Sequence, residues 1–297
     1  MSAFSIQQQK PDTAAMRQRF EAQLALSRQY LDTGKQADRL LLEGDMRTMP
    51  DFVALKNRQH PDLHLCIADS PTSLLAQLKT MPPAFHLRCA LRSEVDAVNG
   101  WHHLYADIRR QTGGPLSILL VEPAHIKENV NGVAMLLQLI VRMLPDPGFH
   151  DKRMSCFNVA VQKSGSDCLI FCIDFALKAF AEAAWIDALH DIHCAGHAIG
   201  NEAGDPVVEQ NNQDTLSVAP ASLLPFSFFE HAQSITELRA IWGDDDPRAA
   251  ALVQHMREQR MLAASNQKPI PSSIEYCRRA FLLEALADLS ASRDQQQ

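Results

Sequence analysis

The sequence has no apolar run long enough to cross a bilayer, which excludes a membrane-spanning helix. Its first residues, Met1–Asp12, lack the apolar core of a secretory signal peptide. The second residue is serine, whereas simple N-myristoylation requires glycine. An internal repeat is also absent. These absences favour a globular protein over a membrane, lipid-anchored or repeat protein.

An excess of basic residues is lacking as well, because 28 Lys and Arg stand against 35 Asp and Glu, a formal net charge of -7. This balance argues against a general nucleic-acid-binding protein. The seven cysteines are odd in number and irregularly spaced, so they do not form a disulfide framework. Free thiols in a reducing compartment fit better. The 297 residues are enough for a sizeable core in one large or two small domains.

The organisation that the sequence does have is a strand-rich middle between helical ends. Residues 1–14 are rich in Ser and Gln and are expected to be disordered. Apolar periodicity predicts a helix over 13–42, a break at Asp45–Pro50 and a short helix after it. Two helical stretches near 248–264 and 272–291 close the chain.

Residues 60–200 are interpreted as an α+β catalytic core, and 15–59 with 201–297 as a helical second unit. Within the core we expect strands at 63–68, 86–91 and 156–162, a helix over 73–79 after a Ser70 cap, an apolar helix over 133–143 and a long helix from Cys168 to about 188. The stretch 196–221 is polar and is expected to be a loop.

Two apolar runs around a Gly-Gly pair predict a β-hairpin in the middle of the core. The first runs over His102–Asp107 and the second over Leu116–Pro123, with a short loop at Arg109–Pro115 between them. A turn centred between Thr112 and Gly113 places His103 opposite Glu122, at a Cβ separation of about 5 Å. An imidazole facing a carboxylate is the base-and-orienter half of a catalytic triad. His102 alternates to the other strand face and is not expected to share this chemistry.

Cys168 is the candidate nucleophile, because it follows a short polar loop and starts a helix. Unpaired N–H groups and the positive end of the helix dipole stabilise a thiolate there. Gln162, at the end of the preceding strand, is placed to direct its amide at a developing oxyanion. The alternative is that Cys168 is one buried thiol among seven. Asp107 is a rival orienter, but four strand residues place it about 13 Å from His103.

One further pattern has metal-like spacing. His190 with His193, or His193 with His197, would share a helix face and offer zinc ligands. A zinc site usually needs a second ligand cluster, and the sequence offers none. We therefore interpret this stretch as a helix end with polar caps and expect no metal.

The candidate catalytic residues described above, and the segments around them, make the chain resemble the YopJ-type acetyltransferase effectors. These are type III-secreted proteins assigned to the cysteine-protease clan CE. The resemblance runs from about Asp45 to Ser234. The segments that carry it are Asp45 with Met49-Pro50, Ser70-Pro71, the block around His103, Val121-Glu122-Pro123-Ala124, Ala134-Met135-Leu136, Gln162-Lys163-Ser164, Asp167-Cys168-Leu169-Ile170-Phe171, Leu224-Pro225 and His231-Ala232-Gln233. The nineteen-residue step from His103 to Glu122 and the order His–Glu–Cys are specific.

The resemblance implies a clan CE cysteine-protease-like core and a helical regulatory domain formed by the two ends of the chain. It implies that His103 is the general base, Glu122 its orienter, Cys168 the acyl-accepting nucleophile and Gln162 the oxyanion donor. Acetyl would pass from acetyl-coenzyme A through Cys168 to Ser, Thr or Lys of host signalling proteins such as kinases. The first residues would be a secretion-type N-terminus, and type III secretion would deliver the protein into the host cell cytoplasm.

The resemblance also implies activation by inositol hexakisphosphate, which needs clustered cations. Arg278 and Arg279 on the last helix are the first candidates, and Arg47 is the next; Lys56, Arg58 and Lys268 are further flanking cations. Lys163, Ser164 and His231 are the remaining candidates for cofactor contacts.

One departure from the family is Glu230, which stands where relatives have a lysine, and it puts automodification at that place in doubt. Two other functions remain open. A cysteine protease or ubiquitin-like deconjugase uses the same triad order, and a binding effector with a decayed site needs no triad at all.

Overall fold

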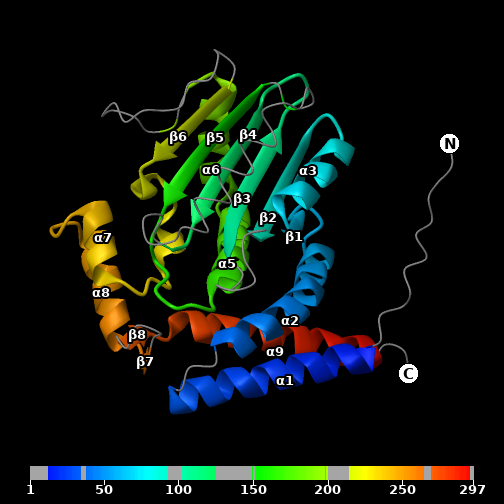
Figure 1. The fold of residues 1–297 in the computed structure, drawn as a ribbon, viewed down its shortest axis with the longest axis vertical. Helices are drawn as coiled ribbons and strands as arrows, with labels where there is room; N and C mark the ends of the chain where they lie inside the picture. The colour runs from blue at the N-terminus through cyan, green and yellow to red at the C-terminus, as the bar shows by residue number, and fades with distance from the viewer. Residues whose placement is uncertain are drawn as a thin grey trace.

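The structure, a computed structural model, describes residues 13–34, 38–92, 102–124, 149, 151–197, 199, 214–263 and 269–294. It has the α+β architecture expected from the sequence, with a central mixed sheet and helices around it (Figure 1). Among these described residues, no helix is both long and apolar enough to cross a membrane. The predicted apolar helix over 133–143 and the cation Lys268 lie outside the described residues.

The sheet has six strands in chain order, β1 to β6. They are β1 (Leu65–Ala68), β2 (Phe85–Arg92), β3 (His103–Arg110), β4 (Leu116–Glu122), β5 (Lys152–Asn158) and β6 (Asp214–Ala219). The pairs β2–β3 and β3–β4 are antiparallel, and the other three pairs are parallel. The expected hairpin is therefore present at the centre of the sheet.

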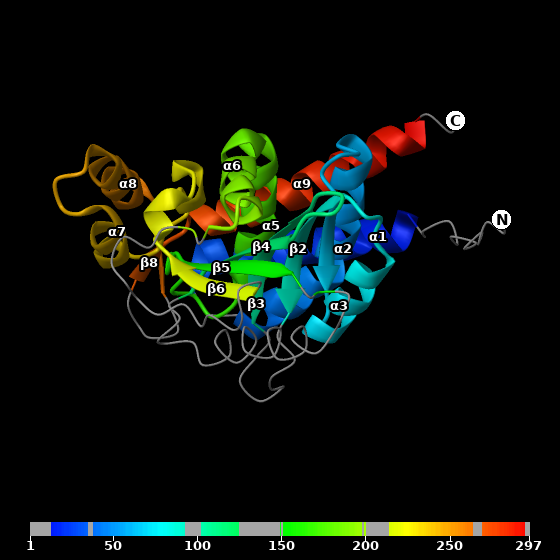
Figure 2. The same ribbon diagram turned by 90° about the horizontal axis from the view of Figure 1, so that it is seen from above.

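The two faces of the sheet are covered by different helices (Figure 2). On one face, α3 (Pro71–Thr80) packs against β1 and β2, and its leucines belong to the same buried cluster as alternate residues of the central strands, such as Ala106 and Ile118. On the other face lie α5 (Cys168–Ala181) and α6 (Ala183–Cys194), which cover the strand positions between them, such as Tyr105 and Val121. Helix α5 is buried along most of its length.

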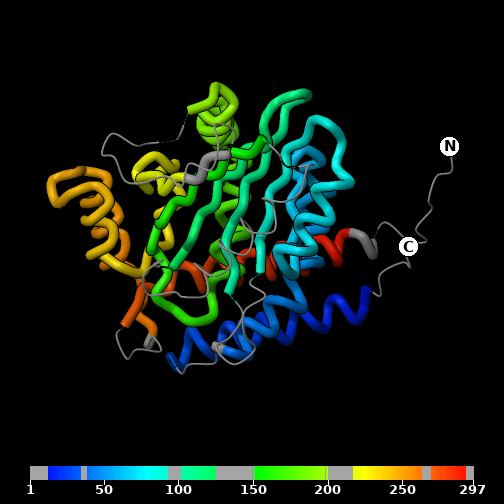
Figure 3. Tube along the Cα trace, turned by 45° about the horizontal axis from the view of Figure 1, so that its top comes forward, coloured from blue at the N-terminus to red at the C-terminus, as the bar shows by residue number. Residues whose placement is uncertain are grey.

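Three long helices form a layer at one end of the sheet (Figures 1 and 3). They are α1 (Thr13–Thr33), α2 (Asp38–Gln59) and α9 (Ser273–Asp294). Phe52 of α2 stacks on Phe281 of α9 with ring centroids 4.6 Å apart, and Lys56 pairs with Glu284 at 2.6 Å. The two ends of the chain therefore meet, and they share one apolar core with α5. Their division from the catalytic core as a regulatory domain stays a prediction.

The remaining elements lie beside this layer. They are the short 3₁₀ turns η2 (Ala221–Leu223) and η3 (Phe226–Phe229), α7 (Ile235–Trp242), α8 (Pro247–Glu258), and the small pair β7 (Met261–Ala263) and β8 (Pro269–Pro271). Asp246 caps α8 by accepting a hydrogen bond from the Arg248 N–H. Ser234 caps α7 in the same way.

The helix boundaries of the N-terminal region differ from the expectation. The predicted helix over 13–42 is two helices, and the predicted break at Asp45–Pro50 lies inside α2. Gly34 ends α1, because its φ of 61° is a left-handed conformation that glycine adopts without strain. Pro50 does not stop α2, since Met49 before it and Phe52 two residues after it are fully buried in the core.

Three other boundaries also differ. Strand β5 begins and ends four residues earlier than the predicted 156–162. The long helix from Cys168 is divided at Glu182 into α5 and α6. The polar stretch 196–221 contains β6, one of the two edge strands of the sheet. The predicted Ser70 cap of α3 is confirmed, with a complete capping box between Ser70 and Ser73.

Candidate active site

The nucleophile candidate lies where the sequence places it, at the first residue of α5. The chain leaves β5 and runs beside the end of β4, where the Gln162 N–H donates to the Pro123 carbonyl at 2.8 Å. It then turns, and the Asp167 carbonyl accepts the first helical hydrogen bond from the Phe171 N–H. Cys168 is only 1% exposed and has no disulfide partner. Its sulfur therefore lies in a dry position at a helix N-terminus.

The hairpin that carries the histidine and the glutamate has a different register from the predicted one. Tyr105 pairs with Val121, one residue away from the expected alignment. The reason is the loop, which is centred on Gly113 rather than before it. Gly113 has a φ of 74°, and the Gly114 N–H closes the turn onto the Gln111 carbonyl at 2.9 Å.

This register brings His102, not His103, to Glu122. Nε2 of His102 lies 2.9 Å from both carboxylate oxygens. Oε1 of Glu122 also accepts the Ala124 N–H at 2.8 Å, which fixes the carboxylate. The predictions that His103 faces Glu122 and that His102 stays apart are therefore wrong. A one-residue shift in an antiparallel pair exchanges which neighbour faces a given side chain.

Both histidines nevertheless reach the sulfur. Nδ1 of His103 lies 3.5 Å from Sγ of Cys168. His102 also hydrogen-bonds to Cys168, and among the described residues it is the one of the two that contacts a carboxylate as well. The structure thus brings the predicted Glu122 and Cys168 together through a histidine that the sequence analysis set aside.

The pKa values of the two histidines move in opposite directions. Burial lowers the pKa of His102, but the charge of Glu122 and the hydrogen bond with Cys168 outweigh it and raise that pKa to about 10. Burial lowers the pKa of His103 to about 3, and the neighbouring charges of His102 and Arg92 act in the same direction. His102 therefore holds a proton at neutral pH, whereas His103 is neutral.

The loop before the nucleophile is held by a residue that sequence reasoning assigned no role, Gln233. Its Oε1 accepts the N–H groups of Lys163 and Ser164 at 2.6 and 2.9 Å. Its Nε2 donates to Asp167 Oδ2 at 3.3 Å, and its own N–H donates to the Val161 carbonyl at 2.7 Å. The available signal was its place two residues after His231, in a segment that carries the family resemblance.

Gln162, the predicted oxyanion donor, is buried beside this loop. Its Nε2 donates one hydrogen bond, to the Ser164 carbonyl at 2.8 Å. The amide has a second N–H, so this contact leaves one donor for another acceptor. Its role at an oxyanion stays a prediction.

Asp167, the residue before the nucleophile, belongs to a buried charge cluster with Arg278 of α9 at its centre. The guanidinium contacts Asp167 Oδ1 at 2.6 Å, Asp45 of α2 at 3.0 Å and Glu275. All four side chains are at most 2% exposed. Burial raises the pKa of Asp45 to about 6 and that of Glu275 to about 8, although Arg278 opposes both shifts.

This cluster corrects one predicted phosphate ligand. Arg278 is 0% exposed and is surrounded by three carboxylates, so it is a structural cation and not a free one. The other candidates differ from it. Arg47 is exposed on α2, and the half-buried Arg279 lies over the Tyr276 ring at 5.9 Å. Neither makes an ion pair with the described residues.

Two of the three remaining cofactor candidates lie at or beside a cleft. The cleft has a volume of about 620 Å³ and is lined by Lys163, Gln233, Ser234, Ile235, Thr236, Met256, Arg257, Met261, Pro269, Ile270 and Pro271. Ser164 adjoins it, with its N–H on Gln233. His231 does not line it: its ring is directed at Asp174, 3.9 Å away. Burial lowers the pKa of His231 to about 3.

Glu230, the departure from the family pattern, contacts a cation of α5. Its carboxylate lies 3.3 Å from the amino group of Lys178. Burial raises the pKa of Glu230, but the charge of Lys178 outweighs this and the net shift is downward. The position is therefore occupied by a partly exposed ion pair, which contributes little to stability.

Comparison with known proteins gives one consistent result. The family model described as YopJ serine/threonine acetyltransferase matches residues 20–284. A serine/threonine-protein acetyltransferase of Sinorhizobium fredii is 31% identical over 162 residues, which are 54% of this chain and 60% of that protein. HopZ1a of Pseudomonas syringae is 24% identical, over 74% of this chain and 63% of its own. YopJ of Yersinia pestis is 24% identical, with 76% and 74% covered.

The matched part thus spans about three fifths of the first two relatives. Solved structures agree on the fold. HopZ1a in complex with IP6 superimposes with a TM-score of 0.69 at 18% identity, covering 94% of this chain and 98% of that one. AvrA delL154 with IP6 and CoA gives 0.64 at 19% identity, covering 93% and 98%. The expected clan CE-like α+β fold is confirmed, and the chain belongs to the YopJ serine/threonine acetyltransferase family.

Proposed function

We propose that the chain is an acetyltransferase whose catalytic triad is Cys168, His102 and Glu122. The observation that carries this proposal is the position of His102, which contacts both the thiol at the start of α5 and the carboxylate at the end of β4. The members of a triad are recognised by their mutual geometry, not by their spacing in sequence. Of the two histidines at the sulfur, His102 is the one that a carboxylate orients.

In this mechanism the proton of the resting pair resides on His102, in keeping with its pKa of about 10. The Cys168 sulfur attacks the thioester carbon of acetyl-coenzyme A and forms an acetyl-cysteine. The departing coenzyme thiolate takes the proton from His102. An acceptor hydroxyl then loses its proton to the now neutral His102 and attacks the acetyl-cysteine, which releases the sulfur. Glu122 holds the ring and stabilises the imidazolium in both halves.

We place coenzyme A in the cleft beside the nucleophile loop. Lys163 and Arg257 supply cations for phosphate groups, and Ile235 and Met256 offer apolar surface. Because Lys163 is also fixed through its N–H to Gln233, the cleft and the nucleophile share one loop. The AvrA structure that contains CoA and IP6 supports the choice of donor.

We further propose that inositol hexakisphosphate activates the enzyme at the helical layer. HopZ1a and AvrA were solved with IP6, and α1, α2 and α9 unite the two ends of this chain. Arg47 and Arg279 are the proposed ligands from this layer. The acceptors would be Ser, Thr or Lys of host signalling proteins such as kinases, reached by secretion into the host cytoplasm.

The experiment is intact-mass analysis of the purified chain after incubation with acetyl-coenzyme A, with and without inositol hexakisphosphate. We expect one acetyl group on the wild type, and none on Cys168→Ala. Cys172→Ala is the matched control, since Cys172 lies one turn further along α5 and is equally buried. An acetyl group that persists in Cys168→Ala would refute the proposal. Cleavage of a ubiquitin-type probe without acetylation would favour the protease alternative instead.

A further inference from the structure

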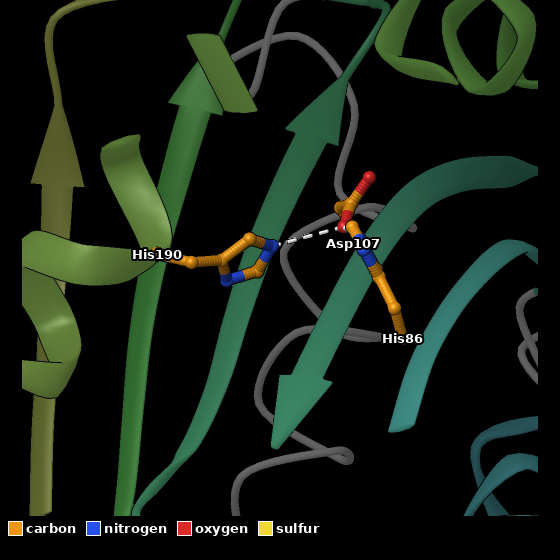
Figure 4. A group of neighbouring side chains, drawn as sticks. All are labelled: His86, Asp107 and His190. Carbon is orange, nitrogen blue, oxygen red and sulfur yellow. Dashed lines mark hydrogen bonds and ion pairs between the residues drawn. The ribbon is translucent and has the colours of Figure 1, made fainter. Parts of the chain in front are cut away.

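A second cluster of imidazole and carboxylate groups lies at the other end of β3. Asp107 is four residues beyond His103 on the same strand face, about 13 Å away. His86 reaches it from β2 and His190 from α6 (Figure 4). The Nε2 atoms of both histidines contact the same oxygen, Oδ1 of Asp107, and His190 does so at 2.9 Å. Side chains from three elements therefore direct potential ligand atoms at one point.

The second nitrogen of each histidine has its own polar neighbour. Nδ1 of His190 lies 2.7 Å from Ser117 Oγ. Nδ1 of His86 lies 4.0 Å from Oδ1 of Asp187. Metal-bound histidines usually have the second ring nitrogen hydrogen-bonded, which fixes the ring and its tautomer. His190 meets this condition, whereas the 4.0 Å separation at His86 is too long for a direct hydrogen bond.

The carboxylate is oriented in the same way. Oδ2 of Asp107 accepts a hydrogen bond from the Tyr105 hydroxyl and lies 3.6 Å from Nε of Arg88. These contacts use one carboxylate oxygen and leave Oδ1 directed at the two histidines. The three ligand atoms lie within 4.8 Å of one another, and a tetrahedral zinc site needs separations of about 3.3 Å.

Behind His190 a buried chain of hydrogen bonds continues along the sheet. Ser117 Oγ also lies 2.7 Å from Nδ1 of His193. The other ring nitrogen of His193, Nε2, lies 2.8 Å from Ser155 Oγ. Ser155 Oγ in turn lies 2.6 Å from Ser217 Oγ. Each hydroxyl can donate one bond and accept another, so the protons of this chain can run in either direction. When they run away from His190, its Nε2 keeps a lone pair for a ligand.

The cluster is closed on one side and open on the other. The side chain of Asp107 is 1% exposed and that of His190 is 0%, whereas that of His86 is 21% exposed. An incoming ion, and a water molecule as a fourth ligand, would therefore enter beside His86. Two imidazole nitrogens, one carboxylate oxygen and an open position form a ligand set that zinc uses.

We propose that His86, Asp107 and His190 bind one divalent transition-metal ion, with zinc as the fitting ion. The ion would tie α6 to β2 and β3. It lies too far from Cys168 to touch the reacting atoms, so it takes no part in a transfer at that thiol. The proposal does not depend on acetyl transfer. The proposed co-ligands of His190 are thus distant in sequence. Its sequence neighbours do not serve, because His193 contacts Ser155 and His197 is exposed.

The test uses the full chain, freed of metal by a chelator and shown to be folded by circular dichroism. Zn²⁺ alone is titrated by calorimetry, and Co²⁺ alone by visible absorption, which reports tetrahedral coordination. We expect one ion per chain and a higher melting temperature with zinc. His86→Ala and Asp107→Asn should each weaken zinc binding about 100-fold or more, because removing a direct ligand costs more than removing a group that only orients one. His197→Ala, from the same metal-like spacing, is the matched control and should bind as the wild type does.

Two results would overturn the proposal. One is a folded wild type that takes up neither ion. The other is uptake that His86→Ala and Asp107→Asn leave unchanged, which would move the site elsewhere, for example to Asp174, His231 and Cys277, whose ligand atoms also lie within 4.8 Å of one another. His86→Ala is the more informative variant, because its partly exposed side chain is the least needed for folding.

Discussion

At one end of β3, His102 lies beside Glu122 and His103 beside Cys168; towards the other end, Asp107 lies between His86 and His190. Both groups are largely buried; the first joins one imidazole to a carboxylate and the second joins two. They differ in what else is present: a thiol at a helix start reaches the first group, and none is among the described contacts of the second. The same side chains therefore support nucleophilic chemistry at one end, and a binding or structural role at the other.

The largest expected effect comes from exchanging the two carboxylates for amides. Glu122→Gln removes the charge that orients His102 and should lower the rate of Cys168 acetylation by about 10³- to 10⁴-fold. Asp107→Asn, the matched change at the other end, should alter that rate less than about threefold while lowering the melting temperature. The measurement is single-turnover labelling with acetyl-coenzyme A. Equal losses in the two variants would contradict the contrast between the ends.

The next largest effect is a loss of stability when the buried charge cluster around Arg278 is broken. Arg278→Met leaves Asp45, Asp167 and Glu275 without their shared cation and should reduce the free energy of unfolding by about 3–5 kcal/mol. Arg58→Met is the matched control, since Arg58 forms a largely exposed pair with Asp288 and should cost less than about 1 kcal/mol. Urea denaturation measures both. A small effect of Arg278→Met would mean that the carboxylates are already neutral without it.

A smaller effect separates the neighbouring histidines. His103→Ala removes a neutral ring that no carboxylate orients, so we expect about a tenfold fall in acetylation rate, against about 10³-fold or more for His102→Ala. The readout is the rate at saturating acetyl-coenzyme A. If His103→Ala proved the more damaging change, the base would be the residue that the sequence predicted.

The smallest effect is a pH dependence of stability. Burial raises the pKa of Glu275 to about 8 from its ordinary value near 4.5. The folded state then binds more protons than the unfolded state between these values, so this group makes stability fall as pH rises from about 4.5 to about 8. Glu275→Gln should flatten the decline measured by urea denaturation across that range. An unchanged slope would remove Glu275 as its cause.

Local chemistry made part of this structure predictable. The Ser70 cap, the hairpin and the helix start at Cys168 follow from residues close together in sequence, and each is present. The family resemblance also followed from such short segments. Of the three residues proposed as the triad, Glu122 and Cys168 were predicted from sequence; in the structure Glu122 contacts His102, and Cys168 contacts His103.

What sequence could not supply depends on single-residue register and on distant partners. Two glycines in one loop allow more than one turn centre, and the choice of Gly113 determined which histidine meets Glu122. Arg278 is adjacent to Arg279 in the sequence, yet one is fully buried and the other is not. Only the packing of α9 on α2 and α5 decides that difference.

The position of Arg278 has a consequence for the timing of synthesis. Asp167, next to the nucleophile candidate, pairs with Arg278, which the ribosome adds 111 residues later. Until α9 has been synthesised and has docked, the Asp167 carboxylate in the turn before Cys168 lacks its ion pair with Arg278. In a chain without α9, the turn before Cys168 would therefore lack this ion pair. Docking of α9 is therefore needed before the carboxylate beside the thiol has its full charge pairing.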